Sequence, residues 1–285
     1  MVHSPTAAAS DHLAEVPEAS APPEIAAIYA RVRYLTGAPM TALIWRHLAT
    51  FPGALPAAWQ AMGPLYEAGV LQEAAWRTAR GSIAIAKADL TAQALAGAGV
   101  SDDVIMAFMR ILDAYNRVNP VNFVAVRALA RRLAAAPPHQ PSPSMPAAQS
   151  WLPPVAIGAL PPMVAVPELA PIDRQMINAL NANPLLDRTQ LVPSLYRHLP
   201  PLGPLIAHIH VALMPRFETG EIQAQVRVTA AALDQEAERC AAFLPALDAL
   251  GTISGVVETL DRFSLLIPEM VVLGRLLRDG LNRPE

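Results

Sequence analysis

The sequence predicts an all-α protein made of two tandem helical repeats that pair as an intramolecular pseudo-dimer. Apolar residues recur at helical spacing along both halves, and no stretch shows a convincing strand pattern. Short motifs of the first half also return in the second half, in the same order and at a nearly constant offset. The repeated pairs are Arg46-His47-Leu48 with Arg197-His198-Leu199, Val16-Pro17-Glu18 with Val166-Pro167-Glu168, Leu112-Asp113 with Leu260-Asp261, and Pro120 with Pro268. Such colinear echoes indicate an ancient duplication.

The composition divides the chain of 285 residues into four segments. Residues 1–15 are small and polar, and we expect a flexible N-terminus there. Residues 16–135 form the first predicted repeat and residues 166–285 the second. The intervening residues 136–165 are rich in proline, which is typical of an extended and semi-rigid linker.

Six helical segments are expected in each half. The first begins at Pro22-Pro23, where proline suits the opening turn, and the fifth begins after Ser101-Asp102-Asp103, a good N-cap signal. In the first half we expect the others at 40–50, 55–67, 72–95 and, after a break at Asn119-Pro120, up to 135. In the second half the patterns cover 172–182, 192–200, 204–215, 221–243, 252–265 and 268–281.

Composition and charge exclude several classes of function. The net charge of −3 offers no basic surface for nucleic acid, and every long apolar stretch is broken by proline or charge before it could span a membrane. The first twenty residues do not resemble a secretory signal, so we expect a soluble, cytoplasmic protein. Cys240 is the single cysteine, and His208 and His210 point about 200° apart on a helix, so no metal site is predicted.

A duplicated helical fold is expected to bind a ligand between its halves, where each half alone presents an incomplete concave face. Pro120 and Pro268 interrupt matching apolar helical patterns, and an interior proline frees the carbonyl four residues before it. Two interpretations remain open for these prolines. They mark plain helix boundaries or kinks, or they help to form a pocket for a small anion or polar ligand beside Asn116 and Asn119.

Two motifs carry a resemblance to a known family. The stretch Leu48-Ala49-Thr50-Phe51-Pro52-Gly53-Ala54-Leu55-Pro56-Ala57-Ala58-Trp59 is followed by Tyr115-Asn116-Arg117-Val118-Asn119-Pro120. In order and spacing they resemble the group I 2-haloacid dehalogenases, which hydrolyse D- and L-2-haloalkanoic acids. The resemblance implies a fused pair of all-helical repeats. It also implies hydrolysis of a carbon–halogen bond by direct attack of water, without a cofactor.

The resemblance also implies where the catalytic base belongs. In the family the base is the Asp of a Ser-Asp pair just before the second-half counterpart of the Leu-Ala-Thr-Phe-Pro motif. Counting from Leu199, that pair falls on Ser194 and Leu195, so the serine is kept and the aspartate is not. Leucine cannot accept a proton, and losing a general base costs roughly 10²- to 10⁴-fold in rate. Asp187 would replace it only if the loop folds back, and is otherwise a solvated loop or cap carboxylate.

The remaining site expectations also follow from the resemblance. Asn119 matches an Asn beside the catalytic water, and Asn122 stands where the family has an aromatic residue. Met40 and Leu43 replace pocket aromatics, so an apolar pocket without aromatic faces is expected there. Ser194 either donates to the substrate carboxylate or is an exposed hydroxyl at a helix start.

The sequence therefore predicts a dehalogenase-like hydrolase that takes a short 2-haloalkanoic acid. The alternative is a non-hydrolytic relative that binds a small carboxylic acid or a partner and has lost the base. No cofactor, nucleic-acid or membrane partner is expected, and a homodimer is left open.

Overall fold

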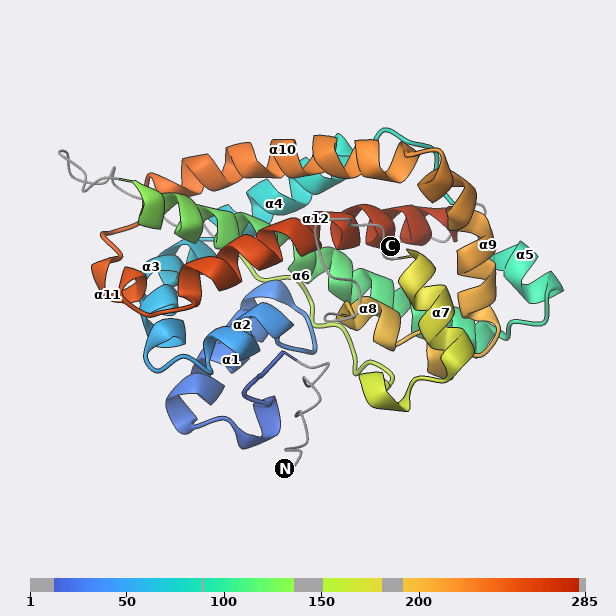
Figure 1. The fold of residues 1–285 in the computed structure, drawn as a ribbon, viewed down its shortest axis with the longest axis horizontal. Helices are drawn as coiled ribbons and strands as arrows, with labels where there is room; N and C mark the ends of the chain where they lie inside the picture. The colour runs from blue at the N-terminus through green and yellow to red at the C-terminus, as the bar shows by residue number, and fades with distance from the viewer. Residues whose placement is uncertain (1–12, 89, 136–150, 181–191, 282–285) are drawn as a thin grey trace, which may run out of the picture.

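The computed structural model describes residues 13–88, 90–135, 151–180 and 192–281, and in these ranges it is all-helical with no strand (Figure 1). The first half contains α1 (Pro23–Thr36), α2 (Leu43–Leu48), α3 (Ala54–Glu67), α4 (Val70–Ser82), α5 (Ala92–Gly97) and α6 (Asp102–Ala134). The second half contains α7 (Pro171–Leu180), α8 (Ser194–Arg197), α9 (Leu205–Glu218), α10 (Glu221–Ala241), α11 (Asp248–Gly251) and α12 (Val256–Gly280). Short 3₁₀ turns occupy Glu18–Ser20, Val166–Glu168 and Pro200–Leu202. The prediction of an all-α fold is confirmed.

Two long helices, α6 and α12, run through the centre of the molecule (Figure 1). They are antiparallel, because Asn116 donates from Nδ2 to the carbonyl of Gly274 while Asp113 pairs with Arg278, farther along α12. The backbones approach closely at this crossing. A Cβ added at Gly274 would lie 2.6 Å from Oδ1 of Asn116, so glycine permits the contact.

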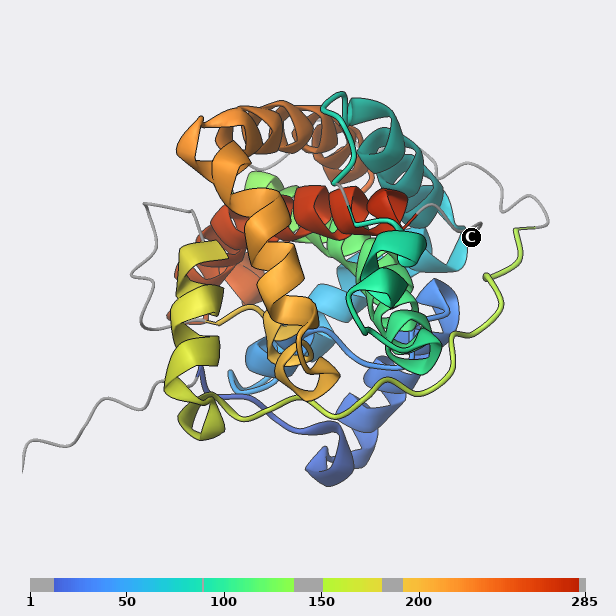
Figure 2. The ribbon, with the colours of Figure 1, turned by 90° about the vertical axis from the view of Figure 1, so that its right-hand side faces the viewer.

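The buried side chains form two apolar clusters, and each cluster draws on both halves of the chain. The first joins α1–α4 and the C-terminal part of α6 to α10, α11 and the start of α12. The second joins the N-terminal part of α6 to α7, α8, α9 and the end of α12. Figure 2 looks along the long axis and shows α7 and α9 side by side, with α10 and α4 along the upper edge. The two halves are thus interleaved through α6 and α12.

Several features recur at the offset found in the sequence. Pro64 lies inside α3 and Pro215 inside α9, both followed by a glycine of positive φ that precedes α4 or α10. The carbonyl of Arg46 accepts a hydrogen bond from the N–H of Val16, and the carbonyl of Arg197 accepts one from Val164. Matching connections therefore hold matching helices in the two halves.

The predicted helix breaks at Pro120 and Pro268 are wrong. Both prolines are buried inside continuous helices, α6 and α12. An interior proline costs about 3 kcal/mol in an isolated helix. Here α6 and α12 bury most of the surrounding turns against each other and against the two clusters, and that burial outweighs the lost hydrogen bond.

The predicted helix over 72–95 is also wrong, because α4 ends at Ser82 and α5 begins only at Ala92. Tertiary hydrogen bonds take the place of helical ones in between. Gln225 of α10 donates from Nε2 to the carbonyl of Ser82 and accepts at Oε1 from the N–H of Ala84, and the N–H of Ala88 donates to Leu276. A buried amide from another helix thus ends α4, which periodicity within the segment could not reveal.

In the ranges that the structure covers, no helix combines the length and apolarity needed to cross a bilayer.

Candidate functional site

A small cavity of about 90 Å³ lies where the two halves meet. It is lined by the start of α2, one face of α6, the start of α8 and one face of α12. The lining residues are Met40, Thr41, Ala42, Leu43, Ile44, Arg46, Tyr115, Asn119, Asn122, Met163, Pro193, Ser194, Leu195, Phe263, Leu266, Ile267 and Met270. A cavity of this size holds a ligand of only a few heavy atoms.

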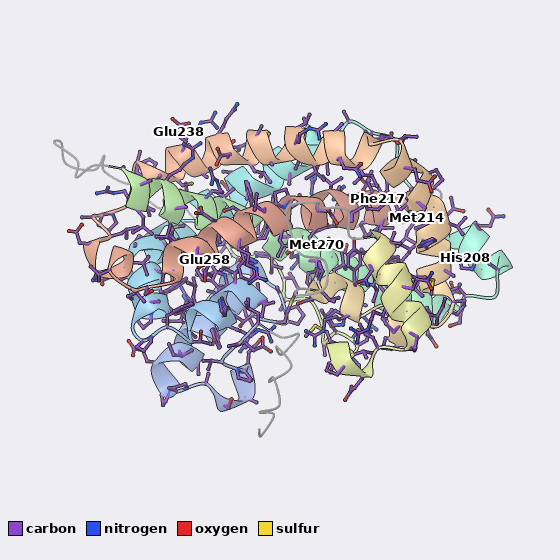
Figure 3. The ribbon with its side chains drawn as sticks, viewed as in Figure 1. His208, Met214, Phe217, Glu238, Glu258 and Met270 are labelled. Carbon is purple, nitrogen blue, oxygen red and sulfur yellow. The ribbon has the colours of Figure 1, made fainter. Side chains whose placement is uncertain are left out.

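The helical periodicity of α6 and α12 brings the lining side chains together. Tyr115, Asn119 and Asn122 follow i, i+4, i+7 spacing on one face of α6, so all three point the same way. Phe263 and Met270 are likewise two turns apart on α12. Figure 3 shows Met270 near the middle of the molecule, well away from His208 on α9. The cavity therefore draws its wall from helices of both halves of the chain.

Six residues that the sequence proposed for the site line this one cavity: Met40, Leu43, Asn119, Asn122, Ser194 and Leu195. Asn116 does not line it, and donates instead to the carbonyl of Gly274. Asp187 lies outside the described residues. Leu195 is only 1% exposed and belongs to the second apolar cluster. Asn122 has a structural partner, since its Oδ1 accepts a hydrogen bond of 2.9 Å from the indole N–H of Trp45.

Three polar atoms in the cavity wall are buried without a hydrogen-bond partner. They are Oγ1 of Thr41, Nε of Arg46 and Nδ2 of Asn119. A buried polar group that loses water without gaining a partner costs about 1–3 kcal/mol. All three atoms carry or can orient a hydrogen, so each of them would be satisfied by an acceptor. A carboxylate, which only accepts, fits this set.

Arg46 is held in place by an ion pair with the N-terminal segment. Its side chain is 13% exposed, and its Nη2 lies 3.1 Å from Oε2 of Glu15. That contact is an ion pair without hydrogen-bond alignment, since the same oxygen has no hydrogen-bond partner. His47 strengthens the attachment of this N-terminal segment, because its Nδ1 lies 2.6 Å from the carbonyl of Ala14. Arg46 therefore lines the cavity while its guanidinium is paired with Glu15.

Tyr115 places a hydroxyl at the same wall. Burial raises the pKa of Tyr115 well above its usual value, although Arg46, a hydrogen bond with Ser194 and Arg197 act to lower it. The phenol is therefore neutral at physiological pH and cannot serve as a base there. The hydroxyl of Tyr115 donates to Sδ of Met163 at 4.0 Å, and Ser194 at the start of α8 lines the same cavity.

Carboxylates do not line the cavity among the residues that the structure describes. Asp113 faces a different cavity and pairs with Arg278, and Asp261 is exposed on α12. Glu269 is buried one residue before Met270 but is not part of the lining. Glu15 is not part of the lining and pairs with Arg46, which is. Leucine at position 195 thus leaves the described wall without a general base.

Metal binding has no support in the described ranges, where no three His, Cys, Asp or Glu side chains are grouped to hold an ion. Cys240 is buried in the first apolar cluster, and burial raises the pKa of its thiol to about 12. The thiol is therefore an inert part of the core.

Sequence reasoning missed Arg46, Tyr115 and Thr41 as residues of the cavity wall. Arg46 indicated the internal repeat and Tyr115 belonged to a family motif, but neither residue was predicted to line a cavity. Thr41 and the α12 face, Phe263 to Met270, were not considered. The signal for Arg46 was its recurrence as Arg197. No local signal distinguishes Thr41 from other hydroxyls, because only the fold places it in the wall.

Comparison with known proteins finds similarity in structure alone. No protein-family profile matches the chain. A search of curated proteins finds no match either.

Solved structures do match over nearly the whole chain. A D-2-haloacid dehalogenase mutant superposes with a TM-score of 0.73 at 16% identity, covering 98% of this chain and 99% of that one. A complex of D-2-haloacid dehalogenase with L-LA gives a TM-score of 0.70 at 16% identity, with the same coverage. A mutant of such an enzyme with D-2-CPA gives 0.66 at 18% identity, covering 96% and 95%. The chain therefore has the helical fold seen in these D-2-haloacid dehalogenases.

Proposed function

We propose that the cavity binds a short 2-haloalkanoic acid and that the protein is a 2-haloacid dehalogenase-like hydrolase. The observation that carries the proposal is the group of three buried, unpartnered donors, from Thr41, Arg46 and Asn119, in a wall where the described residues supply no carboxylate. The substrate carboxylate would accept from these donors. The fold shared with solved D-2-haloacid dehalogenases supports the same ligand class.

The rest of the wall suits the other end of such a ligand. Leu43, Phe263, Leu266 and Met270 are apolar and line the cavity. They would surround the halogen and the short alkyl group, excluding bulk water from the reacting carbon. The volume of about 90 Å³ limits the acid to a short chain.

In the proposed reaction a water oxygen bonds to carbon 2, the carbon–halogen bond breaks, and the halide leaves with the bonding electrons. The proton from water must pass to a base. Asn119 would orient the water, as the family resemblance implies. Asp187 is the proposed base, and the proposal of hydrolysis depends on it.

A second candidate function is binding of a small carboxylic acid without hydrolysis. Leu195 favours it, because an apolar residue stands where the resemblance places the catalytic aspartate. Binding would survive in such a protein, since the donors of Thr41, Arg46 and Asn119 do not depend on the base.

The experiment measures halide release and binding together, using the full chain with each enantiomer of 2-chloropropionate. Halide release that Asp187→Asn abolishes, with binding retained, supports hydrolysis. Calorimetric binding without release above the buffer rate rejects the hydrolase and supports the second candidate. Neither binding nor release overturns both.

A further inference from the structure

We propose that Tyr29 is a positioning residue of the candidate site, because its hydroxyl occupies a backbone carbonyl that would otherwise hold Nε of Arg46. Tyr29 does not line the cavity, whereas Arg46 does. The inference rests on the proposed function, in which Nε of Arg46 donates to the ligand carboxylate.

The two halves of the chain form the same backbone connection at the repeated Arg-His-Leu motif. The N–H of Val16 donates to the carbonyl of Arg46 at 3.0 Å, and the N–H of Val164 donates to the carbonyl of Arg197 at 2.9 Å. Because the backbone contact is the same, a difference between the two arginine side chains needs a local cause.

The two side chains do differ. Nε of Arg197 donates to the carbonyl of Val164 at 2.9 Å, so this valine exchanges both of its backbone hydrogen bonds with one arginine. Nε of Arg46 is also buried, but it finds no hydrogen-bond partner among the described residues. A buried donor normally takes an acceptor within its reach. We therefore looked for a group that competes for the carbonyl of Val16.

Tyr29 is that group. Its hydroxyl donates to the carbonyl of Val16 at 3.1 Å, and its side chain is buried in α1. Burial raises the pKa of Tyr29 to about 12, although the nearby charge of Arg46 acts to lower it. The hydroxyl therefore keeps its proton at neutral pH and remains a donor. The carbonyl that is open to Arg197 in the second half is already in use in the first half.

The sequence explains why only the first half has this competitor. Helices α1 and α7 both begin with a proline, and the spacing between these prolines equals the spacing between Val16 and Val164. The same spacing places Ile177 at the position of Tyr29. Both side chains are 1% exposed, but isoleucine has no hydroxyl. Ile177 therefore cannot compete for the carbonyl of Val164.

A second difference between the halves lies beside the same valines. Glu15 precedes Val16 and pairs with Nη2 of Arg46 at 3.1 Å, whereas the uncharged Met163 precedes Val164. This ion pair engages Nη2 and does not occupy the carbonyl of Val16. Tyr29 is thus the group whose removal should open that carbonyl to Nε.

In Tyr29→Phe we expect Nε of Arg46 to donate to the carbonyl of Val16, as Arg197 does to Val164. A ligand would then have to displace a hydrogen bond made by a charged group, so affinity for 2-chloropropionate should fall by about tenfold or more. Stability should change little, because the carbonyl exchanges one donor for another. A tyrosine with a purely structural role would show the reverse pattern, lower stability and unchanged affinity.

The test combines calorimetry with 2-chloropropionate, urea unfolding and a crystal structure of the ligand-free Tyr29→Phe variant, all on the full chain. Tyr66→Phe is the matched control, since its buried hydroxyl has no partner and Tyr66 does not line the cavity. In an Arg46→Met background, Tyr29→Phe should cause no further loss of affinity, because the two residues act through one atom.

The expected variant structure has Nε of Arg46 about 3 Å from the carbonyl oxygen of Val16. Equal affinities of Tyr29→Phe and Tyr66→Phe, or Nε away from that oxygen, overturn the proposal. Movement of Nε to the carbonyl in Glu15→Gln but not in Tyr29→Phe also overturns it. If the unsubstituted chain binds no 2-chloropropionate, the proposed function fails, while the ligand-free structure still decides whether Tyr29 controls Nε.

Discussion

Replacing Arg46 by methionine removes the charged donor of the first cavity while keeping the aliphatic part of the side chain. The guanidinium has two contacts to lose: the ion pair with Glu15 at 3.1 Å, and the ligand that its buried Nε would meet. The first contact bears on stability and the second on affinity, so the two effects are measured separately.

The magnitudes follow from burial. A hydrogen bond to a charged group contributes about 1.5–3 kcal/mol. Affinity for 2-chloropropionate should therefore fall by about 10- to 150-fold in Arg46→Met. Loss of the ion pair should lower the free energy of unfolding by about 1–3 kcal/mol, because it leaves the buried Oε2 of Glu15 without its charged neighbour. The variant should thus remain folded and lose binding.

Calorimetry with 2-chloropropionate and urea unfolding measure the two effects. Arg31→Met is the matched control, because Arg31 also pairs with a glutamate, Glu67, and neither residue lines the cavity. A dissociation constant for Arg46→Met within threefold of the Arg31→Met value would refute the assignment of Arg46 to ligand binding.

Three further substitutions test other parts of the account. Leu195→Asp places a carboxylate in the cavity wall and should create or raise halide release, at a cost of about 2–5 kcal/mol in stability from lost packing. Burial lowers the pKa of His198 to about 4. Between about pH 6.5 and pH 4 the unfolded chain therefore binds a proton at His198 that the folded chain does not bind. Stability should fall by about 2 kcal/mol from pH 7.5 to pH 5, and His198→Gln should remove that part of the slope in urea unfolding. Gly69→Ala should destabilise by more than about 1–2 kcal/mol, because φ is +70° and the new Cβ would lie 2.2 Å from the ring of Trp151.

Each of these predictions has a defined comparison. Leu195→Asn loses the same packing without gaining a base, so equal halide release by the Asp and Asn variants would count against a base at this position. His198→Gln is compared with the unsubstituted chain, and an unchanged pH slope in the variant would contradict the role of burial at His198. Gly81→Ala meets no atom within 4 Å and has no positive φ, so it should not destabilise. If it destabilises as much as Gly69→Ala, the contact with Trp151 is not the cause.

The fold was accessible from the sequence because its signals are local and repeated. Helical periodicity marks α3, α9 and α10 closely, and the Ser101 hydroxyl caps α6 as expected, accepting from the N–H of Val104. The errors arose where distant contacts decide the backbone. Burial keeps α6 and α12 helical across their internal prolines. At the end of α4, the side chain of Gln225 in α10 donates a hydrogen bond to the carbonyl of Ser82.

The cavity was predicted in part, because local sequence motifs contain two of its residues. Asn119 and Ser194 were found through motifs, and the structure brings them into one wall. The sequence could not predict that Oγ1 of Thr41 and Nε of Arg46 lack hydrogen-bond partners, because this depends on which groups the fold brings near them.

A crystal structure of the full chain with bound 2-chloropropionate tests the central claim most directly. The account predicts the ligand carboxylate within about 3 Å of Nε of Arg46, Nδ2 of Asn119 and Oγ1 of Thr41. The halogen should face Phe263 and Met270. Ligand found only outside this cavity, or a carboxylate turned away from Arg46 and Asn119, would contradict the assignment of this site.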